Sequence, residues 1–111
     1  MAGRALITGS SGGIGRAIAL RLAREGWSVG IHYAHNACAA EAAAREAETL
    51  GVRAEVFKAD AARIPEMQAM VSDFVSRMGG LELLVNNVGQ TVCRPFLETD
   101  EALFDELVAM N

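Results

Sequence analysis

The chain has 111 residues, 51% of them hydrophobic and 22% charged, and a formal net charge of −4 at pH 7. That length accommodates one domain with a single core, and the composition is close to the average for globular proteins, which argues against disorder. The acidic balance argues against nucleic acid as a main partner, and no apolar stretch approaches the roughly 20 residues that span a bilayer, which argues against a membrane partner.

Short apolar runs alternate along the chain with longer segments of helical periodicity. The apolar runs predict four strands, over residues 4–9, 27–33, 52–60 and 81–87. The periodic segments predict four helices, over residues 13–26, 36–51, 65–80 and 99–110. This alternation predicts βαβ units with right-handed crossovers. The expected fold class is therefore α/β, a doubly wound parallel sheet, in one domain over residues 1–111.

Several residues mark where the predicted helices begin and end. Asn36 suits an N-cap, and Pro65 suits the first turn of a helix. Glycine often ends a helix because it readily adopts a left-handed conformation, and three glycines stand at such positions: Gly26, Gly51 and Gly79. Within the first predicted helix, helical spacing places four side chains on one face: Ile14, Ala17, Ile18 and Leu22.

Neither the cysteines nor the histidines form a metal or disulfide pattern. Cys38 and Cys93 lie far apart without Cys-x-x-Cys spacing, and indicate free thiols in a cytoplasmic protein. His32 and His35 have no Cys or carboxylate cluster near them, so we expect no metal site. The N-terminus lacks the apolar segment of a signal peptide, which also favours a cytoplasmic location.

The stretch TGSSGGIG, residues 8–15, joins the first predicted strand to the first predicted helix. Gly9, Gly13 and Gly15 suit a tight turn that leads into a helix start. Free backbone N–H groups and the positive end of the helix dipole would form an anion site there, suited to a pyrophosphate. The alternative is a flexible loop whose glycines merely permit the turn. The strand–turn–helix context favours the phosphate-binding interpretation.

The glycine spacing and three further stretches carry a family resemblance. The spacing is Thr-Gly-x-x-x-Gly-x-Gly, without the Lys-Ser/Thr pair of a Walker loop. FKAD ends at Asp60, LVNNVG covers residues 84–89, and FDELVAMN ends at Asn111. Together these motifs resemble the short-chain dehydrogenase/reductase family over the whole chain. The glycine spacing disfavours the nucleotide-sugar epimerases that share this fold.

The resemblance implies an incomplete Rossmann-like sheet with strand order 3-2-1-4, and it implies a set of residues around a dinucleotide. Asp60 corresponds to the position that holds the adenine ring, while Asn87 and Gly89 correspond to positions beside the nicotinamide-side ribose. The implied cofactor-binding residues are Gly9, Ser10, Ser11, Gly12, Gly13, Ile14, Gly15, Tyr33, Asp60, Ala61, Asn87 and Gly89. Taken singly, Asp60 also fits a turn-capping acid, and Asn86 and Asn87 also fit ordinary turn residues.

The end of the second predicted strand bears on which nicotinamide cofactor is bound. An acidic residue there would bind the ribose hydroxyls and repel a 2′-phosphate, which selects NAD. The family pattern places the neutral Tyr33 at this position, so NADP(H) is favoured over NAD(H). Candidate partners of the 2′-phosphate are Arg16, His32, His35 and Asn36. Against this preference, Gly12 stands where many NADP-preferring relatives carry Arg or Lys.

The family transfers a hydride between C4 of the nicotinamide and a carbonyl or alcohol carbon, with a Tyr phenol as general acid–base. In the family a Lys lowers the phenol's pKa, a Ser orients the substrate oxygen, and an Asn holds a water in the proton relay. Of these four, the resemblance supplies only Asn111 as a catalytic residue. The one tyrosine, Tyr33, lies on the adenosine side and has Ala37, not Lys, four residues further on.

We therefore expect the N-terminal, cofactor-binding part of a reductase, truncated at the active-site Asn and inactive alone. Residues 81–87 would then form an open sheet edge. The helix over residues 99–110 resembles the family's subunit contact, so the full-length form is expected to be a homo-oligomer. The implied reaction is NADPH-dependent reduction of a carbonyl, as in 3-oxoacyl-thioester reductases; the alternative is a non-catalytic dinucleotide-binding module. The substrate is not identified, and Thr91 and Arg94 fit either a substrate contact or a solvated loop.

Overall fold

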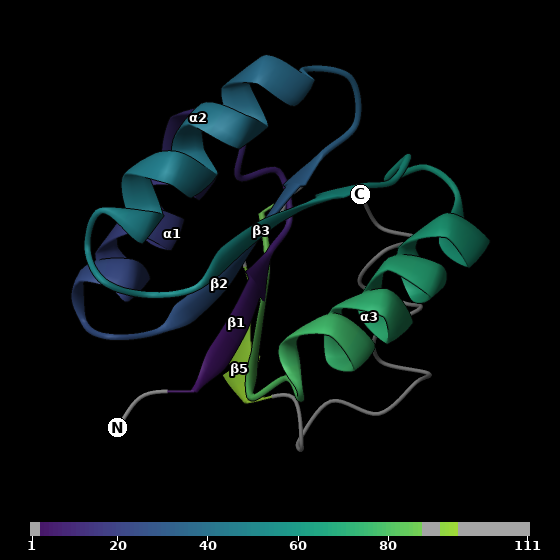
Figure 1. Ribbon diagram of the computed structural model, residues 1–111. Helices are drawn as coiled ribbons and strands as arrows, with labels where there is room; N and C mark the ends of the chain where they lie inside the picture. The colour runs from purple at the N-terminus through teal and green to yellow at the C-terminus, as the bar shows by residue number, and fades with distance from the viewer. Residues whose placement is uncertain (1–2, 88–91, 96–111) are drawn as a thin grey trace.

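The computed structural model describes residues 3–87 and the backbone of residues 92–95 (Figure 1). Its elements follow the predicted alternation of strand and helix. They are β1 (Arg4–Ile7), α1 (Gly13–Arg24), β2 (Ser28–Tyr33), α2 (Ala37–Glu48), β3 (Ala54–Lys58), α3 (Ile64–Met78), β4 (Leu83–Asn86) and β5 (Val92–Pro95). The predicted helix over residues 99–110 lies outside the described residues.

The strands form one sheet in the order β3-β2-β1-β4-β5. The first four are parallel neighbours, which confirms the predicted order 3-2-1-4. The sequence does not predict β5, which pairs antiparallel with β4 and places Asn86 opposite Val92. The expectation of an open edge at the fourth strand is therefore wrong, and Arg94 lies in a strand rather than in a loop. The run Val-Cys-Arg-Pro is too short to reveal a strand period.

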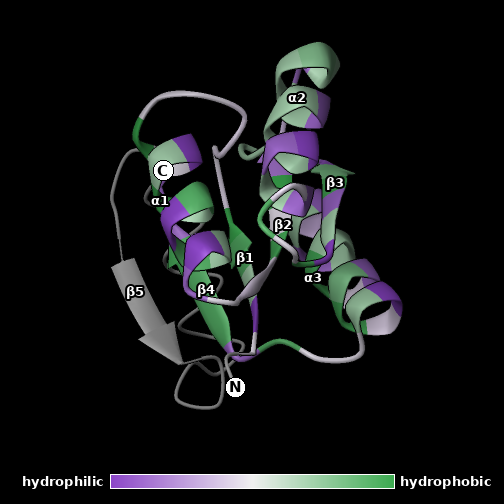
Figure 2. Cartoon of the chain, turned by 60° about the vertical axis from the view of Figure 1, so that its left-hand side comes forward, coloured by the Kyte–Doolittle hydropathy of each residue, from purple (hydrophilic) through white to green (hydrophobic). Residues whose placement is uncertain are grey.

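Helices cover both faces of the sheet. α1 and α2 lie on one face and α3 lies on the other (Figure 1). Because side chains alternate along a strand, Ile7 and Ile31 belong to the core under α1 and α2, while Leu6 and Phe57 belong to the core under α3. Figure 2 shows β1 and β4 as largely hydrophobic, whereas each helix carries both hydrophobic and hydrophilic residues. This pattern fits a parallel sheet buried between two helical layers.

α1 approaches the sheet through small residues. Its buried positions are Gly15, Ala19 and Ala23. Ile18 and Leu22 pack against the core in part, but Ile14 is 72% exposed and Ala17 is exposed as well. The single apolar face predicted from the spacing is therefore wrong at its N-terminal end. Small residues let the helix backbone lie close to the strands there, and this leaves Ile14 facing solvent.

The predicted ends of the other helices agree with the structure, except that α2 ends at Glu48, three residues before Gly51. Asn36 caps α2, because its Oδ1 accepts a hydrogen bond of 3.0 Å from the N–H of Ala39. Pro65 lies in the first turn of α3, and Gly79 ends that helix with a φ of 88°. Four residues at helical spacing form the buried face of α3: Met67, Met70, Phe74 and Met78. Of the helices described, none is long and apolar enough to cross a membrane.

Candidate functional site

The turn between β1 and α1 leaves the start of α1 open. Gly12 is the N-cap with φ −162° and ψ 178°, no side chain caps the helix, and its first turn carries no acidic residue. A Cβ built on Gly12 or Gly13 would meet no atom within 4 Å. The first N–H groups of an α-helix have no acceptor within the helix, and together with the helix dipole they favour an anion. The geometry can therefore hold a phosphate group.

The turn requires glycine for two different reasons, a left-handed backbone and a lack of space. Gly9 has a φ of 64°. Gly13 has a φ of 60°, in the left-handed region that L-residues avoid. Gly15 lies against the turn itself, since a Cβ built on it would be 2.3 Å from the carbonyl oxygen of Gly9 and 2.6 Å from Nδ2 of Asn87. The glycine at position 15 thus lets the helix start, the turn and the end of β4 pack together.

Thr8 joins the turn to β4. Its N–H donates to the carbonyl oxygen of Val85 over 2.9 Å, and its Oγ1 lies 3.1 Å from Oδ1 of Asn86. The same hydroxyl accepts from the N–H of Asn87 over 2.8 Å. Nδ2 of Asn87 in turn donates to the carbonyl oxygen of Gly9 over 3.3 Å. The two asparagines are therefore bonded to the glycine-rich turn. Ordinary turn residues after a strand would not need these contacts.

Ser10 and His32 support the turn from inside. Ser10 is fully buried, and its Oγ donates to the carbonyl oxygen of Ile7 over 2.6 Å and accepts from the N–H of His32 over 3.0 Å. The hydroxyl of Ser10 thus points into the protein. His32 is 2% exposed, and its ring nitrogens bond to the backbone of Gly9 and Ala59. The expectation that His32 is a partner of a 2′-phosphate is wrong, because its ring is buried and both ring nitrogens are bonded to backbone groups. The sequence of β2 does not reveal that this side chain points inward.

The other candidates for a 2′-phosphate lie near the start of α2. Tyr33 ends β2 and is half-buried, whereas His35 and Asn36 are exposed. The Oδ1 of Asn36 caps the helix, as described above. Arg16 reaches across to α2, where its Nη2 lies 2.8 Å from Oε1 of Glu46. Of these candidates, His35 is the exposed side chain that has no hydrogen bond or ion pair within the part of the chain that the structure describes.

Asp60 follows β3 in a short turn. Its Oδ1 accepts from the N–H of Ala62 over 2.9 Å, so the turn-capping alternative is realised in the structure. The N–H of Asp60 donates to Oε1 of Glu66 over 2.9 Å, a contact from the first turn of α3 that the sequence does not reveal. Ala61 is half-buried beside the core under α3. The contact of Asp60 with an adenine ring stays a prediction.

Some predicted site residues cannot be placed. Gly89, Thr91 and Asn111 lie outside the described residues, and only the backbone of Arg94 is described. The described part of the site therefore consists of the turn of residues 8–15, the ends of β2 and β3, and Asn86 and Asn87 after β4. These segments meet at the carboxyl ends of parallel strands. Since β1 lies between β2 and β4, which are reached through helices on opposite faces, this is the position where ligands bind in doubly wound sheets.

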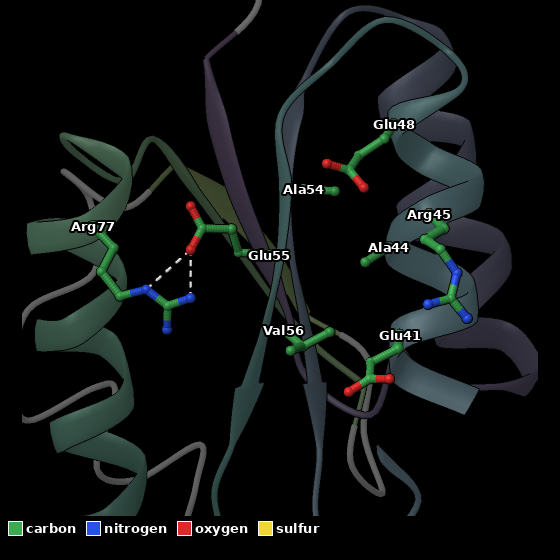
Figure 3. Close-up of a pocket in the computed structure, with 8 residues that line it drawn as sticks. All are labelled: Glu41, Ala44, Arg45, Glu48, Ala54, Glu55, Val56 and Arg77. Carbon is green, nitrogen blue, oxygen red and sulfur yellow. Dashed lines mark hydrogen bonds and ion pairs between the residues drawn. The ribbon is translucent and has the colours of Figure 1, made fainter. Parts of the chain in front are cut away.

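A shallow pocket of about 260 Å³ lies away from this site, between α2, β3 and α3 (Figure 3). Glu55 binds Arg77 there, and it also accepts from Nε of Arg53 over 2.7 Å. Burial raises the pKa of Glu55, but the hydrogen bonds from both arginines outweigh it and leave the pKa below its ordinary value. The guanidinium carbon of Arg77 lies 4.3 Å from the ring centre of Phe57. None of the residues that line the pocket belongs to the glycine-rich turn.

Comparison with known proteins gives one consistent family. The sequence model of the short chain dehydrogenase family matches residues 4–111. The chain is 40% identical over 107 residues to the 3-oxoacyl-[acyl-carrier-protein] reductase FabG of Staphylococcus aureus, covering 96% of this chain and 44% of that protein. It is 36% identical to the hydroxynaphthalene reductase arp2 of Aspergillus fumigatus, covering 96% of this chain and 39% of that protein.

Solved structures agree with the sequence comparison. A dehydrogenase/reductase of Sinorhizobium meliloti superposes with a TM-score of 0.77 at 38% identity, covering 96% of this chain and 46% of that chain. A dehydrogenase of Burkholderia cenocepacia with bound NADP superposes with a TM-score of 0.75 at 33% identity, covering 96% of this chain and 41% of that one. The chain thus spans less than half the length of these relatives. The family match, the strand order and the glycine-rich turn agree, and the chain belongs to the short-chain dehydrogenase family.

Proposed function

We propose that this chain is the cofactor-binding part of an NAD(P)(H)-dependent oxidoreductase that reduces a carbonyl. The observation that carries the proposal is the start of α1, which has no capping side chain and no acidic first turn, at the carboxyl end of the central strand β1. A pyrophosphate would lie there against the backbone of Ser11, Gly12 and Gly13. The exposed side chain of Ile14 would be covered by the bound dinucleotide.

We further infer that NADP(H) is preferred over NAD(H). The end of β2 carries the neutral Tyr33, so no acid repels a 2′-phosphate at that position. The exposed His35 and Asn36 lie two and three residues further on, immediately before α2. The relative from Burkholderia cenocepacia binds NADP, which supports the same preference. Gly12, which offers no cation, is the residue that argues against it.

The proposed substrate is a 3-oxoacyl thioester or a similar carbonyl compound, and the support is the 40% identity to the Staphylococcus aureus reductase. The bound nicotinamide would supply the hydride. Asn111 is proposed to hold a water in the proton relay. Because the 111 residues contain one tyrosine, Tyr33, and no Tyr-x-x-x-Lys, we propose that they do not catalyse turnover by themselves. We further propose that the whole protein is a homo-oligomer, on the resemblance of residues 99–110 to a subunit-contact helix. We propose a cytoplasmic location on the two cysteines, which lack disulfide or metal spacing.

Equilibrium titrations with NADPH and NADH, followed by nicotinamide fluorescence, test this proposal. We expect the 111-residue polypeptide to bind NADPH more tightly than NADH and not to oxidise it in the presence of a 3-oxoacyl thioester. Carbonyl reduction by this polypeptide would contradict the proposed inactivity, and tighter binding of NADH would contradict the cofactor preference. The mass of the polypeptide in its native source is the companion measurement. A mass near 11.8 kDa would favour a non-catalytic dinucleotide-binding module instead.

A further inference from the structure

His32 makes two hydrogen bonds that allow one state of its ring. Nδ1 accepts from the N–H of Gly9 over 2.8 Å, and Nε2 lies 2.9 Å from the carbonyl oxygen of Ala59. A backbone N–H can only donate and a carbonyl oxygen can only accept. The ring therefore satisfies both partners as the neutral tautomer with its proton on Nε2. A doubly protonated ring would direct an N–H at the N–H of Gly9.

The two partners belong to the two halves of the candidate site. Gly9 opens the glycine-rich turn, and Ala59 immediately precedes Asp60. The backbone of His32 adds to this link, because its N–H donates to Oγ of Ser10 and its carbonyl oxygen accepts from the N–H of Ser10 over 3.2 Å. One side chain of β2 thus connects the turn after β1 with the turn after β3.

We propose that His32 is a positioning residue of the dinucleotide site, which works as a neutral imidazole, and that protonation of its ring weakens dinucleotide binding. This inference rests on the proposed function of the turn. It concerns a residue that does not touch the ligand itself, since His32 is 2% exposed. His32 would act on dinucleotide binding through its hydrogen bond to the N–H of Gly9, which orients the backbone at the start of the glycine-rich turn.

Among the described residues, no charged side chain bonds to the ring of His32, since both ring nitrogens bond to backbone groups. Ile31 points to the core under α1 and α2, so the ring of His32 lies on the α3 side of the sheet. Among the described residues, the charged side chains on the α3 side or in the turn before α3 include Glu55 and Arg77, which bind each other, and the exposed Asp60, Arg63 and Glu66. Lys58 follows Phe57 and therefore points to the other face. Arg63 and Glu66 pair with each other over 3.2 Å. On the other face, Arg16 pairs with Glu46.

The residues that approach from β1 and β4 are uncharged: Thr8, Ser10, Asn86 and Asn87. Burial lowers the pKa of His32 below its ordinary value of 6.5, and the hydrogen bond to Ala59 opposes that effect only in part. A pKa lowered by folding means that the neutral ring is favoured in the native protein. Its stabilising contribution is complete above pH 6.5 and is lost as the pH falls through the native pKa.

Two variants separate the two hydrogen bonds. The amide oxygen of an Asn side chain falls near the position of Nδ1, and the amide nitrogen of a Gln side chain falls near the position of Nε2. His32→Asn therefore keeps an acceptor for Gly9, and His32→Gln keeps a donor for Ala59. Neither side chain titrates. We expect His32→Gln to raise the Kd for NAD⁺ about tenfold at pH 8, the size expected when a buried N–H loses its partner. We expect His32→Asn to bind within about threefold of wild type.

The experiment measures the Kd for NAD⁺ from pH 8 down to the acid limit of folding, on the natural polypeptide that contains these residues. NAD⁺ is the probe because it lacks the 2′-phosphate, a group that itself titrates near pH 6, at about the second pKa of phosphate monoesters. In the wild type the Kd should rise as the pH falls, whereas in His32→Asn the Kd should stay flat. His35→Asn is the matched control, and it should retain the pH dependence of the wild type whatever its absolute affinity.

The outcomes separate this inference from the proposed function. If the wild type does not bind NAD⁺ or NADP⁺ at pH 8, the proposed function fails. If it binds, but the wild type and His32→Asn share one pH profile, the positioning role of His32 is refuted. If His32→Gln does not fold, NMR replaces it: the amide signal of Gly9 should shift with the same pKa as the ring of His32. Independent titration of the two signals would overturn the inference.

Discussion

The side chain of Asn87 donates from Nδ2 to the carbonyl oxygen of Gly9 over 3.3 Å, so the residue after β4 is bonded to the second residue after β1. Gly15 lies against both of them, without space for a side chain. A turn, a helix start and a strand end that are separate in the sequence therefore pack together as one unit.

Gly15→Ala should distort this unit. The new Cβ would be placed 2.3 Å from the carbonyl oxygen of Gly9, which is backbone and cannot rotate away. We expect the free energy of unfolding to fall by about 1–3 kcal/mol, as for other overpacked sites. Urea denaturation measures this change. Gly12→Ala is the control for stability, because nothing lies within 4 Å of its Cβ, and it should cost less than about 1 kcal/mol. Equal losses in the two variants would contradict the close packing at Gly15.

Thr8→Val should loosen the connection between β1 and β4. The change removes a buried hydroxyl that accepts from the N–H of Asn87 and lies 3.1 Å from Oδ1 of Asn86. We expect a loss of about 1–3 kcal/mol, because buried polar groups are left without a partner. Faster hydrogen exchange of the Asn87 amide should accompany it. Thr8→Ser retains the hydroxyl, so a Ser variant as unstable as the Val variant would show that the bonds contribute little.

Phe74→Ala should remove the centre of the core under α3. Phe74 is fully buried, and its ring centre lies 5.3 Å from that of Phe57. Truncation of a buried Phe typically costs about 3–5 kcal/mol, and we expect a value in that range from thermal or urea unfolding. The neighbouring Val75→Ala serves as the matched control. Val75 is 38% exposed, and the change should cost less than about 1 kcal/mol.

Acid should weaken the contact between Arg4 and Glu82, whose Nη2 and Oε2 atoms lie 2.8 Å apart. The hydrogen bond from Arg4 lowers the pKa of Glu82 below its ordinary value of 4.5. A pKa lowered by folding contributes stability above pH 4.5, and this contribution is lost as the pH falls through the native pKa. Both side chains are more than a third exposed, so solvent screens the pair and we expect its contribution to stability to be small.

The test compares the stability of wild type and Glu82→Gln at neutral pH and near pH 3. Glu82→Gln should be less stable at neutral pH and should lose less stability on acidification. Glu48→Gln is the control, since Glu48 is an exposed residue for which the structure gives no ion pair among the described residues. A Glu82→Gln variant with the acid response of the wild type would refute the contribution of this contact.

Features that depend on neighbours in the sequence could be predicted from it. The N-cap of Asn36 and the helix end at Gly79 are local, and both are confirmed. The strand order follows from the alternation of strand and helix together with the family resemblance. The positions that could not be predicted depend on contacts between distant segments. Ile14 is exposed because α1 packs against the sheet through Gly15. The spacing of apolar residues within the helix does not predict this contact.

The same limit applies to His32. Its place in the sequence, beside Tyr33 and close to His35, fits a polar residue near a phosphate. Whether it points outward depends on the register of β2 between β1 and β3, which pairs His32 with Phe57. The N–H of Gly9, two residues after β1, and the carbonyl oxygen of Ala59, directly after β3, then bond to its ring. The position of β5 is likewise a matter of pairing rather than of local pattern.

The charged residues on β3 have a consequence for how molecules meet in solution. β3 is an outer strand of the sheet, and Glu55 on it is bound by Arg53 and Arg77, with the exposed Lys58 at its end. A strand from a second molecule could pair with β3 only by breaking these ion pairs and removing the charged groups from water. Outer strands that carry such charges resist edge-to-edge aggregation. We therefore expect that molecules do not associate through β3 at concentrations where an uncharged outer strand would begin to polymerise.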